Sequence, residues 1–294
     1  MLRRSSHTPT RREFLYALAL SALGTLAAGA SSVAYARYVE PYWPQLERIR
    51  VPLARLPTAW RGLRILQLSD FHLGRLVSAE DIAPALRLTH RVAPDLICLT
   101  GDFITADADH LQPLTPLLEQ LHAPLGVYAV LGNHDYWSSV GVVIEQLQAA
   151  GVRVLRNEAV RLEQANVPLW LLGVDDVWEN QQDLATTRAN IPPDECQIAL
   201  VHEPDYADEV AATGVDLQLS GHSHGGQIRL PGIGALVLPR WARKYPIGLQ
   251  RVGTMWIYTN RGLGVIYPPI RFNCRPEVTL LTLAPVDDKP SMLR

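Results

Sequence analysis

Five apolar, strand-like runs in this 294-residue chain are each followed at once by side chains that divalent metals bind. In an α/β fold, side chains converge when they follow the carboxyl ends of neighbouring strands, because those ends open onto one crevice. The pattern therefore favours folds in which five strand ends meet at a common site. In order, the motifs are Asp70-Phe71-His72, Gly101-Asp102, Gly132-Asn133-His134-Asp135, His202 and Gly221-His222-Ser223-His224.

The first half of the chain alternates between apolar runs and amphipathic helical stretches. Strands separated by helices of about a dozen residues are typical of βαβ units with parallel pairing. The predicted strands cover 63–68, 95–100 and 126–131, and the predicted helices cover 79–92, 111–121 and 142–150.

The second half changes to short strand patterns with few helices between them, which predicts a second sheet packed on the first. We therefore expect an α/β domain over 61–294 with two facing mixed sheets flanked by helices. Residues 37–60 are expected to form a linker and an edge strand over 46–53. The strands predicted in the second half cover 152–155, 159–162, 169–174, 197–201, 217–219, 235–238, 255–258 and 278–282.

The N-terminal segment has the plan of an export signal. The pair Arg11-Arg12 precedes an uncharged stretch over 14–36, which ends in an A-x-A site at Ala34-Tyr35-Ala36. Paired arginines before an apolar run are typical of the twin-arginine signal. Because a membrane helix needs only about 20 residues, the stretch also fits an anchor. Residues 1–36 are thus predicted to be a signal or an anchor, with the protein in the periplasm or on the outer face of the cytoplasmic membrane.

Charge disfavours one class of partner. Residues 1–36 contain four arginines and one glutamate, so removing them leaves a net charge of about −5, whereas a basic face is expected for nucleic-acid binding. No stable nucleic-acid binding is therefore expected. The expected partners are a phosphoester substrate, the twin-arginine export machinery and a membrane surface or lipid.

Each motif alone is a weak signal, because D-x-H or G-D is more often an ordinary turn and a lone histidine more often a core residue. Together they leave clustered polar groups at the ends of apolar strands, which is costly unless something binds them. Two carboxylates, four imidazoles and one amide suit manganese, iron or zinc better than calcium or magnesium. Two such cations lower the pKa of a shared water and clamp phosphoryl oxygens during in-line displacement.

In that order, D-x-H, G-D, G-N-H-D, H and G-H-x-H are similar to the motifs of the calcineurin-like metallophosphoesterase superfamily. The resemblance covers about 64–282. The stretches SGHSHGGQ at 220–227 and RFNCRPEV at 271–278, with the export signal, resemble the small bacterial twin-arginine-exported phosphodiesterase branch. The resemblance implies an αββα sandwich.

The resemblance to this superfamily also implies two divalent metal ions whose bridging hydroxide attacks the phosphate ester. His134 is implied to face the substrate without binding metal and to act as the catalytic acid–base group. The implied ligands are Asp70, His72 and His224 for one ion, Asn133, His202 and His222 for the other, and Asp102 for both.

The substrate is less well defined. A phosphodiesterase acting outside the cytoplasm is the leading hypothesis, with two alternatives: a membrane-anchored hydrolase of a lipid-linked phosphate or pyrophosphate, and a non-catalytic member of the fold. Residues 230–250 are predicted to form either a lip that contacts the membrane or a hairpin packed inside the second sheet. The candidate substrate residues, which as loop residues could equally be ordinary solvated side chains, are Arg75, Tyr136, Trp137, Arg240, Lys244 and Tyr245.

Overall fold

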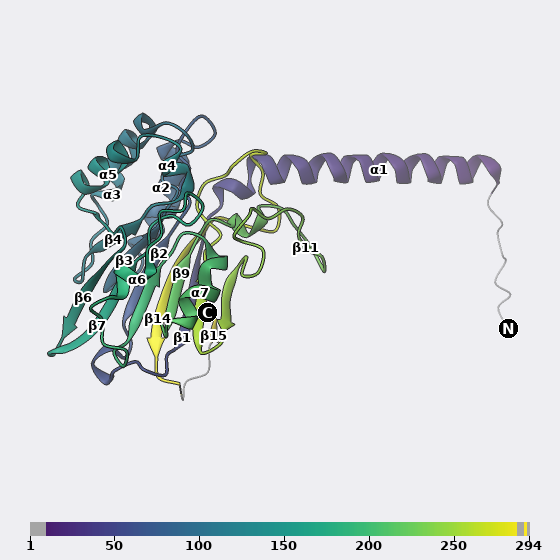
Figure 1. Cartoon of the computed structure of the whole chain (residues 1–294). Helices are drawn as coiled ribbons and strands as arrows, with labels where there is room; N and C mark the ends of the chain where they lie inside the picture. Colours follow the sequence, from purple (N-terminus) through teal and green to yellow (C-terminus); the bar gives the residue numbers. More distant parts are fainter. Residues whose placement is uncertain (1–9, 287–290, 293–294) are drawn as a thin grey trace, which may run out of the picture.

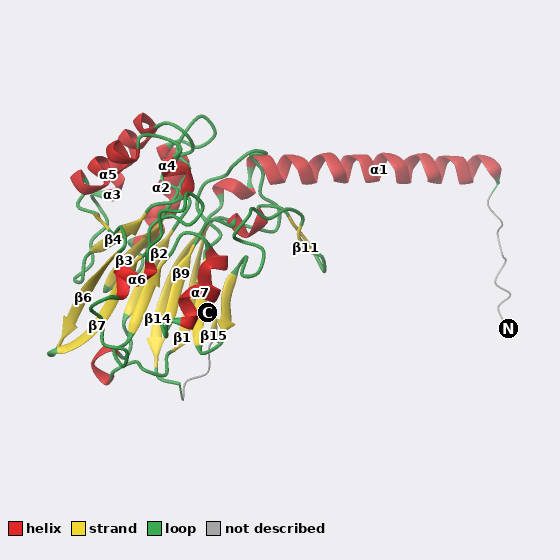
Figure 2. Cartoon of the chain, in the orientation of Figure 1, coloured by secondary structure: helices red, strands yellow, loops and turns green. Residues whose placement is uncertain are grey.

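Two sheets lie face to face, and helices cover their outer faces (Figures 1 and 2). The computed structural model describes residues 10–286 and 291–292. Between the sheets, inward-facing aliphatic side chains from both layers pack together, as Ile65 and Leu281 of one sheet do with Ile198 of the other. This arrangement confirms the predicted α/β sandwich of two mixed sheets flanked by helices.

In the described part of the chain, the first sheet has the strand order β15-β1-β14-β2-β3-β4-β5. Strands β2 to β5 run parallel to one another, whereas β14 is antiparallel to β2 and parallel to β1. The strands are β1 (Gln45–Pro52), β2 (Arg64–Leu68), β3 (Leu96–Thr100), β4 (Val127–Val130), β5 (Arg153–Val154), β14 (Glu277–Ala284) and β15 (Ser291–Met292).

The second sheet has the order β12-β13-β9-β8-β7-β6 among the described residues. Its inner strands β7, β8, β9 and β13 are parallel, and the outer strands β6 and β12 are antiparallel to their neighbours. The strands are β6 (Glu158–Gln164), β7 (Val167–Gly173), β8 (Gln197–Leu200), β9 (Leu217–Ser220), β12 (Gly248–Val252) and β13 (Met255–Thr259).

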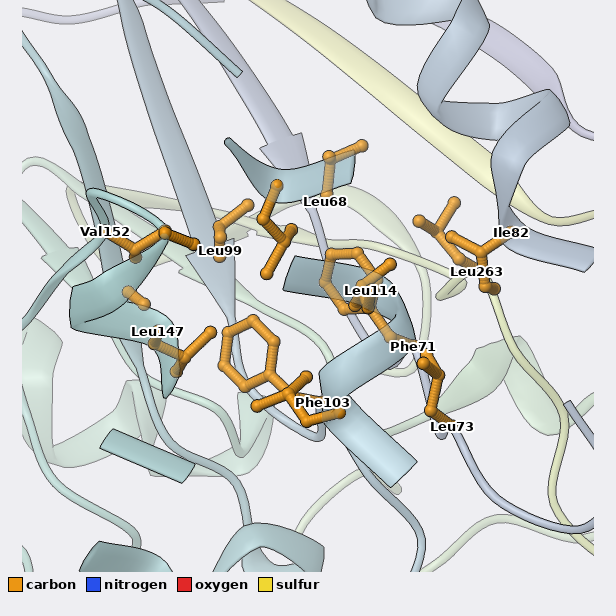
Figure 3. Packing of buried hydrophobic residues seen from close by; sticks show 14 of the residues in the cluster. Leu68, Phe71, Leu73, Ile82, Leu99, Phe103, Leu114, Leu147, Val152 and Leu263 are labelled. Atoms are coloured by element: carbon orange, nitrogen blue, oxygen red, sulfur yellow. The ribbon is translucent and has the colours of Figure 1, made fainter. Parts of the chain in front are cut away.

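Helices seal the outer faces because their apolar sides pack on the sheets. Ile82 of α2 and Leu147 of α5 pack over the first sheet, and Val210 of α7 packs over the second. Figure 3 shows part of the packing beneath the first sheet's helices. The helices are α2 (Ala79–Thr89), the 3₁₀ helix η3 (Ala108–Leu114), α3 (Thr115–Leu118), α4 (Asn133–Tyr136), α5 (Val140–Ala149), α6 (Leu184–Arg188) and α7 (Ala207–Ala212).

Several predicted elements differ from the structure. Strands β5 and β14, predicted for the second sheet, belong to the first, and β1 is flanked by β15 and so is not the edge strand. The helix predicted over 111–121 is divided into η3 and α3 at a Pro-containing stretch. The strand predicted over 235–238 is limited to β11 (Gly234–Ala235), which pairs only with β10 (Arg229–Leu230). The division of the chain at residues 36 and 60 stays a prediction.

The N-terminal helix α1 (Arg11–Tyr38) projects away from the two sheets (Figure 1). Thr10 caps its first turn and exchanges hydrogen bonds with Glu13. By length and composition alone, α1 could cross a membrane. Only its last turns contact the body, where the Ala36 carbonyl accepts a 2.9 Å hydrogen bond from the Arg271 amide.

Candidate metal centre

The carboxyl ends of β2, β3, β4, β8 and β9 lie at one edge of the sandwich, and each motif follows one of them. The backbone turns there are unusual. Asp70, His72 and Asp102 have φ between 50° and 54°, and His222 and His224 have φ of 67° and 49°. Left-handed backbone at non-glycine residues costs roughly 1–3 kcal/mol each and gathers at functional sites.

Hydrophobic packing holds the first two loops in these conformations. Phe71 follows Asp70 and Phe103 follows Asp102, and their rings stack with centroids 5.3 Å apart (Figure 3). Both rings are fully buried against the helices of the first sheet. Each aspartate is therefore fixed by a neighbour that is locked in the core.

One group of donor atoms is formed by Asp70, His72 and His224. The two imidazole Nε2 atoms lie 2.8 Å apart, and His224 Nε2 lies 3.4 Å from an Asp70 carboxylate oxygen. All three side chains are almost fully buried. Two ring nitrogens and a carboxylate oxygen this close suit a shared cation.

A second group is formed by Asp102, His202 and His222. The His202 Nε2 atom lies 3.1 Å from Asp102 Oδ2, and the His222 Nδ1 atom lies 3.2 Å from His202 Nε2. The other nitrogen of each ring donates to a backbone carbonyl: His202 Nδ1 to Thr100 at 2.6 Å, and His222 Nε2 to Arg240 at 2.8 Å. Such outer hydrogen bonds fix the tautomer, so the inner nitrogens are left free to bind metal.

Asn133 supplies a test of whether a cation fits. Its Oδ1 atom is buried and has no hydrogen-bond partner among the described residues. A buried amide oxygen without a partner is costly. Because an amide oxygen is a metal ligand, a cation beside it would remove that cost. The residues present therefore fit divalent metals.

The charges of the site are strongly coupled. Burial raises the pKa of Asp70 to about 6 and lowers that of His72 to about 3. Burial also opposes ionisation of Asp102, but His202 and His134 outweigh it and hold the pKa of Asp102 well below its usual range. Burial likewise opposes the charge of His202, but Asp102 raises the pKa of His202 well above its usual value. Without a cation, protons would therefore occupy part of the site.

The Asp135 carboxylate links the loop that contains Asp102 to the loop that begins at Gly132. It accepts hydrogen bonds from the amides of Gly132, Asp102 and Phe103 at 2.9–3.0 Å. Gly132 is required beside it, because a Cβ there would lie 2.3 Å from Asp102 Oδ1. Asp135 therefore positions the Asp102 loop.

His134 lies at the mouth of the site with one ring nitrogen engaged. Its Nδ1 donates to the Thr105 carbonyl at 2.7 Å, and its amide donates to Asp102 Oδ1 at 3.0 Å. The ring also meets the His72 ring edge-on, with centroids 4.6 Å apart. These contacts leave Nε2 free to exchange a proton, which suits an acid–base role.

Two tryptophans form an aromatic rim beside the donor groups. Trp137 packs on His134 with centroids 4.4 Å apart, and Trp178 meets Trp137 and His222 at 5.9 and 5.6 Å. The Trp178 amide donates to the buried carboxylate of Glu203 at 3.2 Å. Sequence reasoning missed Trp178 and Glu203, although both follow strand ends, β7 and β8, at the edge where the motifs gather.

Four of the other candidate substrate residues contact protein partners. Tyr136 accepts a 2.7 Å hydrogen bond from Arg156, and the Arg240 side chain lies over the Trp241 ring. Lys244 and Tyr245 both bind Asp208 of α7. Arg75 is exposed in a pocket of about 490 Å³ that Thr105, Asp107 and His110 also line. Of the six, Trp137 packs its side chain on His134, and Arg240 accepts a hydrogen bond from the His222 ring through its backbone carbonyl. Substrate binding by any of them stays a prediction.

Comparison with known proteins identifies the family. The calcineurin-like phosphoesterase family model matches residues 63–226. The chain is 36% identical to the uncharacterised metallophosphoesterase YkuE of Bacillus subtilis (strain 168), over 93% of this chain and 97% of that protein. It is 35% identical to phosphodiesterase YaeI of Escherichia coli (strain K12), over 93% and 99%. UDP-2,3-diacylglucosamine pyrophosphatase LpxG of Chlamydia trachomatis (serovar D) is 28% identical, over 87% and 94%.

The matched segment begins just before β2 and ends just after the last motif, so it contains all five strand-end motifs. Two relatives align with the chain over nearly their whole lengths. The chain therefore belongs to the calcineurin-like phosphoesterase family and is a metallophosphoesterase, a hydrolase of phosphoric esters.

Proposed function

We propose that the protein is a dinuclear metal-dependent phosphodiesterase that acts outside the cytoplasm. The position of Asp102 is the main support for a centre with two metal ions. Its carboxylate groups with His202 and His222 on one side and with His72 and His134 on the other, and the donor atoms of each group lie within 4.8 Å of one another. A carboxylate shared in this way suits a bridge between two cations.

The residues divide into ligands and a proton carrier. When bound, two divalent cations lower the pKa of a shared water and neutralise charge on the phosphoryl oxygens. Thr105 holds the His134 ring through Nδ1, so that Nε2 can give a proton to the leaving oxygen. The ligands would be Asp70, His72 and His224 for one ion, Asn133, His202 and His222 for the other, and Asp102 for both.

The mixed nitrogen and oxygen donors suit manganese, iron or zinc. The similarity to phosphodiesterase YaeI supports a phosphodiester substrate. The similarity to the pyrophosphatase LpxG, together with the apolar α1, supports a lipid-linked pyrophosphate as the second candidate.

The test is a substrate panel of phosphate monoesters, phosphodiesters and pyrophosphates, assayed with full-length protein loaded with Mn²⁺, Fe²⁺ or Zn²⁺. We expect turnover of phosphodiesters that requires metal and is lost with a chelator. Turnover confined to monoesters would contradict the proposed substrate class. Metal titration to a stoichiometry of one ion per chain at full activity would contradict the dinuclear centre.

We also propose that α1 is a twin-arginine signal that stays in place as an anchor. Arg11 and Arg12 begin α1, ahead of its uncharged stretch. The A-x-A site lies within the helix, and Ala36 is only 4% exposed. Because proteases cut exposed, flexible segments most readily, a buried helical end is a poor cleavage site. Replacing Arg11 and Arg12 with lysines should leave the folded enzyme in the cytoplasm, and unchanged export would contradict the twin-arginine route.

A further inference from the structure

The β10–β11 hairpin exposes aliphatic side chains that no other part of the described structure covers. Ile233, Leu236 and Val237, here called the apolar tip, are 73%, 53% and 77% exposed. Gly232, in the turn between the strands, and Gly234, at the start of β11, have φ of 76° and 91°. Clustered exposed aliphatic residues on a protein surface mark a binding surface.

The hairpin is joined to the foot of α1 through one short segment of chain. The Ala36 carbonyl at the end of α1 accepts from the Arg271 amide at 2.9 Å. The next residue, Phe272, accepts through its carbonyl from the Arg229 amide of β10, also at 2.9 Å. Figure 1 shows the β11 hairpin projecting on the side from which α1 leaves the body. The apolar tip and α1 therefore face the same surroundings.

Aromatic residues and arginines lie at the foot of α1. Tyr38, the last residue of α1, and Trp43, shortly after it, are exposed. Arg37 lies over the Tyr38 ring at 5.2 Å, and Arg275 lies over the Trp43 ring at 4.0 Å. Exposed tyrosine and tryptophan rings beside arginines are typical of the interface between a bilayer and water.

The length of α1 indicates how deep in a bilayer the aromatic and arginine side chains at its foot would lie. The uncharged stretch 14–36 lies wholly within the helix, and at about 1.5 Å per residue it spans about 35 Å. The hydrocarbon core of a bilayer is about 30 Å thick. If α1 spans the bilayer, Ala36 lies at the headgroup layer, and so does the hairpin that is bonded to the same segment.

We propose that the apolar tip inserts into the outer leaflet of the membrane that α1 spans. This inference rests on the proposed anchoring by α1. Two membrane contacts, α1 and the apolar tip, would fix the orientation of the two-sheet body relative to the membrane. A single helix would leave the body free to rotate. The hairpin begins a few residues after His224, so the mouth of the metal centre is held close to the headgroup layer.

The test uses the full chain reconstituted into vesicles of phosphatidylethanolamine and phosphatidylglycerol. Val237→Cys is labelled with a polarity-sensitive fluorophore, and Gln164→Cys, at the exposed end of the β6–β7 hairpin, is the matched control. The native cysteines, Cys98, Cys196 and Cys274, are buried, so labelling of the folded protein is selective. Lipids with a nitroxide at the headgroup or along the acyl chain serve as quenchers.

We expect the probe at 237 to shift to the blue and to be quenched by shallow nitroxides, because interfacial segments lie about 5–10 Å below the surface. The probe at 164 should keep the emission of a water-exposed dye. A probe at 237 that behaves like the control would overturn the inference, as would equal quenching at both positions. A blue shift that depends on protein concentration but not on nitroxide lipid would assign the tip to a second copy of the chain instead.

Activity on a soluble phosphodiester, measured on the same samples, separates this inference from the proposed function. Neither labelled position belongs to the metal centre, so both samples should turn over at the unmodified rate. Quenching without activity would count against the proposed chemistry alone. Protein that washes off the vesicles in alkaline carbonate would overturn the anchor and the inference together.

Discussion

The metal centre and the apolar tip depart from the usual distribution of side chains in opposite directions. The centre buries carboxylates and imidazoles that are at most 5% exposed, and the tip exposes aliphatic side chains that are at least 53% exposed. Each arrangement is unfavourable in the isolated chain. Together they show how a structure indicates missing partners: buried donors call for a cation, and exposed hydrocarbon calls for an apolar phase.

The two regions also differ in how firmly the fold holds them. At the centre, five non-glycine residues adopt left-handed backbone, and surrounding contacts such as the stacked Phe71 and Phe103 sustain it. At the tip, glycines take the left-handed positions, and two residue pairs join the strands. Substitutions should therefore have large consequences at the centre and small ones at the tip.

The largest expected effect comes from Asp102→Asn. Metal ions contribute several kcal/mol of transition-state stabilisation. At 1.36 kcal/mol per factor of ten, losing them should lower kcat/KM at least about 10³-fold. Elemental analysis of the purified protein should show that metal is lost in step with activity. Asp194→Asn, at an exposed position, is the matched control and should keep both. Full metal content with no activity would contradict the bridging role.

His134→Ala should separate chemistry from metal binding. We expect both ions to remain bound while the rate falls roughly 10²–10⁴-fold, the range for an acid–base group. The loss should be largest for esters with poor leaving groups, because these need a proton most. Normal turnover of such an ester by the variant would rule out the assigned role, and loss of metal would place His134 among the ligands.

Metal affinity should rise with pH between about 5 and 7.5. Asp70, whose pKa is raised to about 6, is mostly protonated at pH 5, so a cation must displace that proton. Competition at this one group predicts about tenfold weaker binding at pH 5 than at pH 7.5. The raised pKa of His202 acts in the same direction, whereas His72, with a pKa of about 3, stays neutral throughout. Calorimetric titration with Mn²⁺ at several pH values measures this, and equal affinity across the range would contradict it.

Much of the donor cluster could be predicted because each motif is short and directly follows an apolar run. His72, for example, lies two residues after Asp70, just past the strand β2. The carbonyls of Thr105 and Arg240, which orient His134 and His222, could not be predicted, because backbone carbonyls carry no residue-specific signal.

The sheet assignments show a second limit. Strand β14 has the same apolar pattern as the strands of the second sheet, yet it inserts between β1 and β2 of the first. Its neighbours are set by pairing over more than 200 residues, as between Glu277 and Gln45, which local periodicity does not encode. Lys244 and Tyr245 illustrate the same point, because a basic-aromatic cluster does not reveal that Asp208 of α7 is its partner.

The smallest expected effect tests whether the apolar tip contributes to the fold at all. Ile233→Ser with Val237→Ser changes two exposed side chains, so the free energy of unfolding in detergent should change by no more than about 0.5 kcal/mol. The same chemical change at Val143, which is fully buried in α5 against the first sheet, should cost about 2–4 kcal/mol. Denaturant titration of the three proteins makes the comparison. A tip variant as unstable as Val143→Ser would mean that its aliphatic residues stabilise the body, and the reason for assigning them to lipid would be lost.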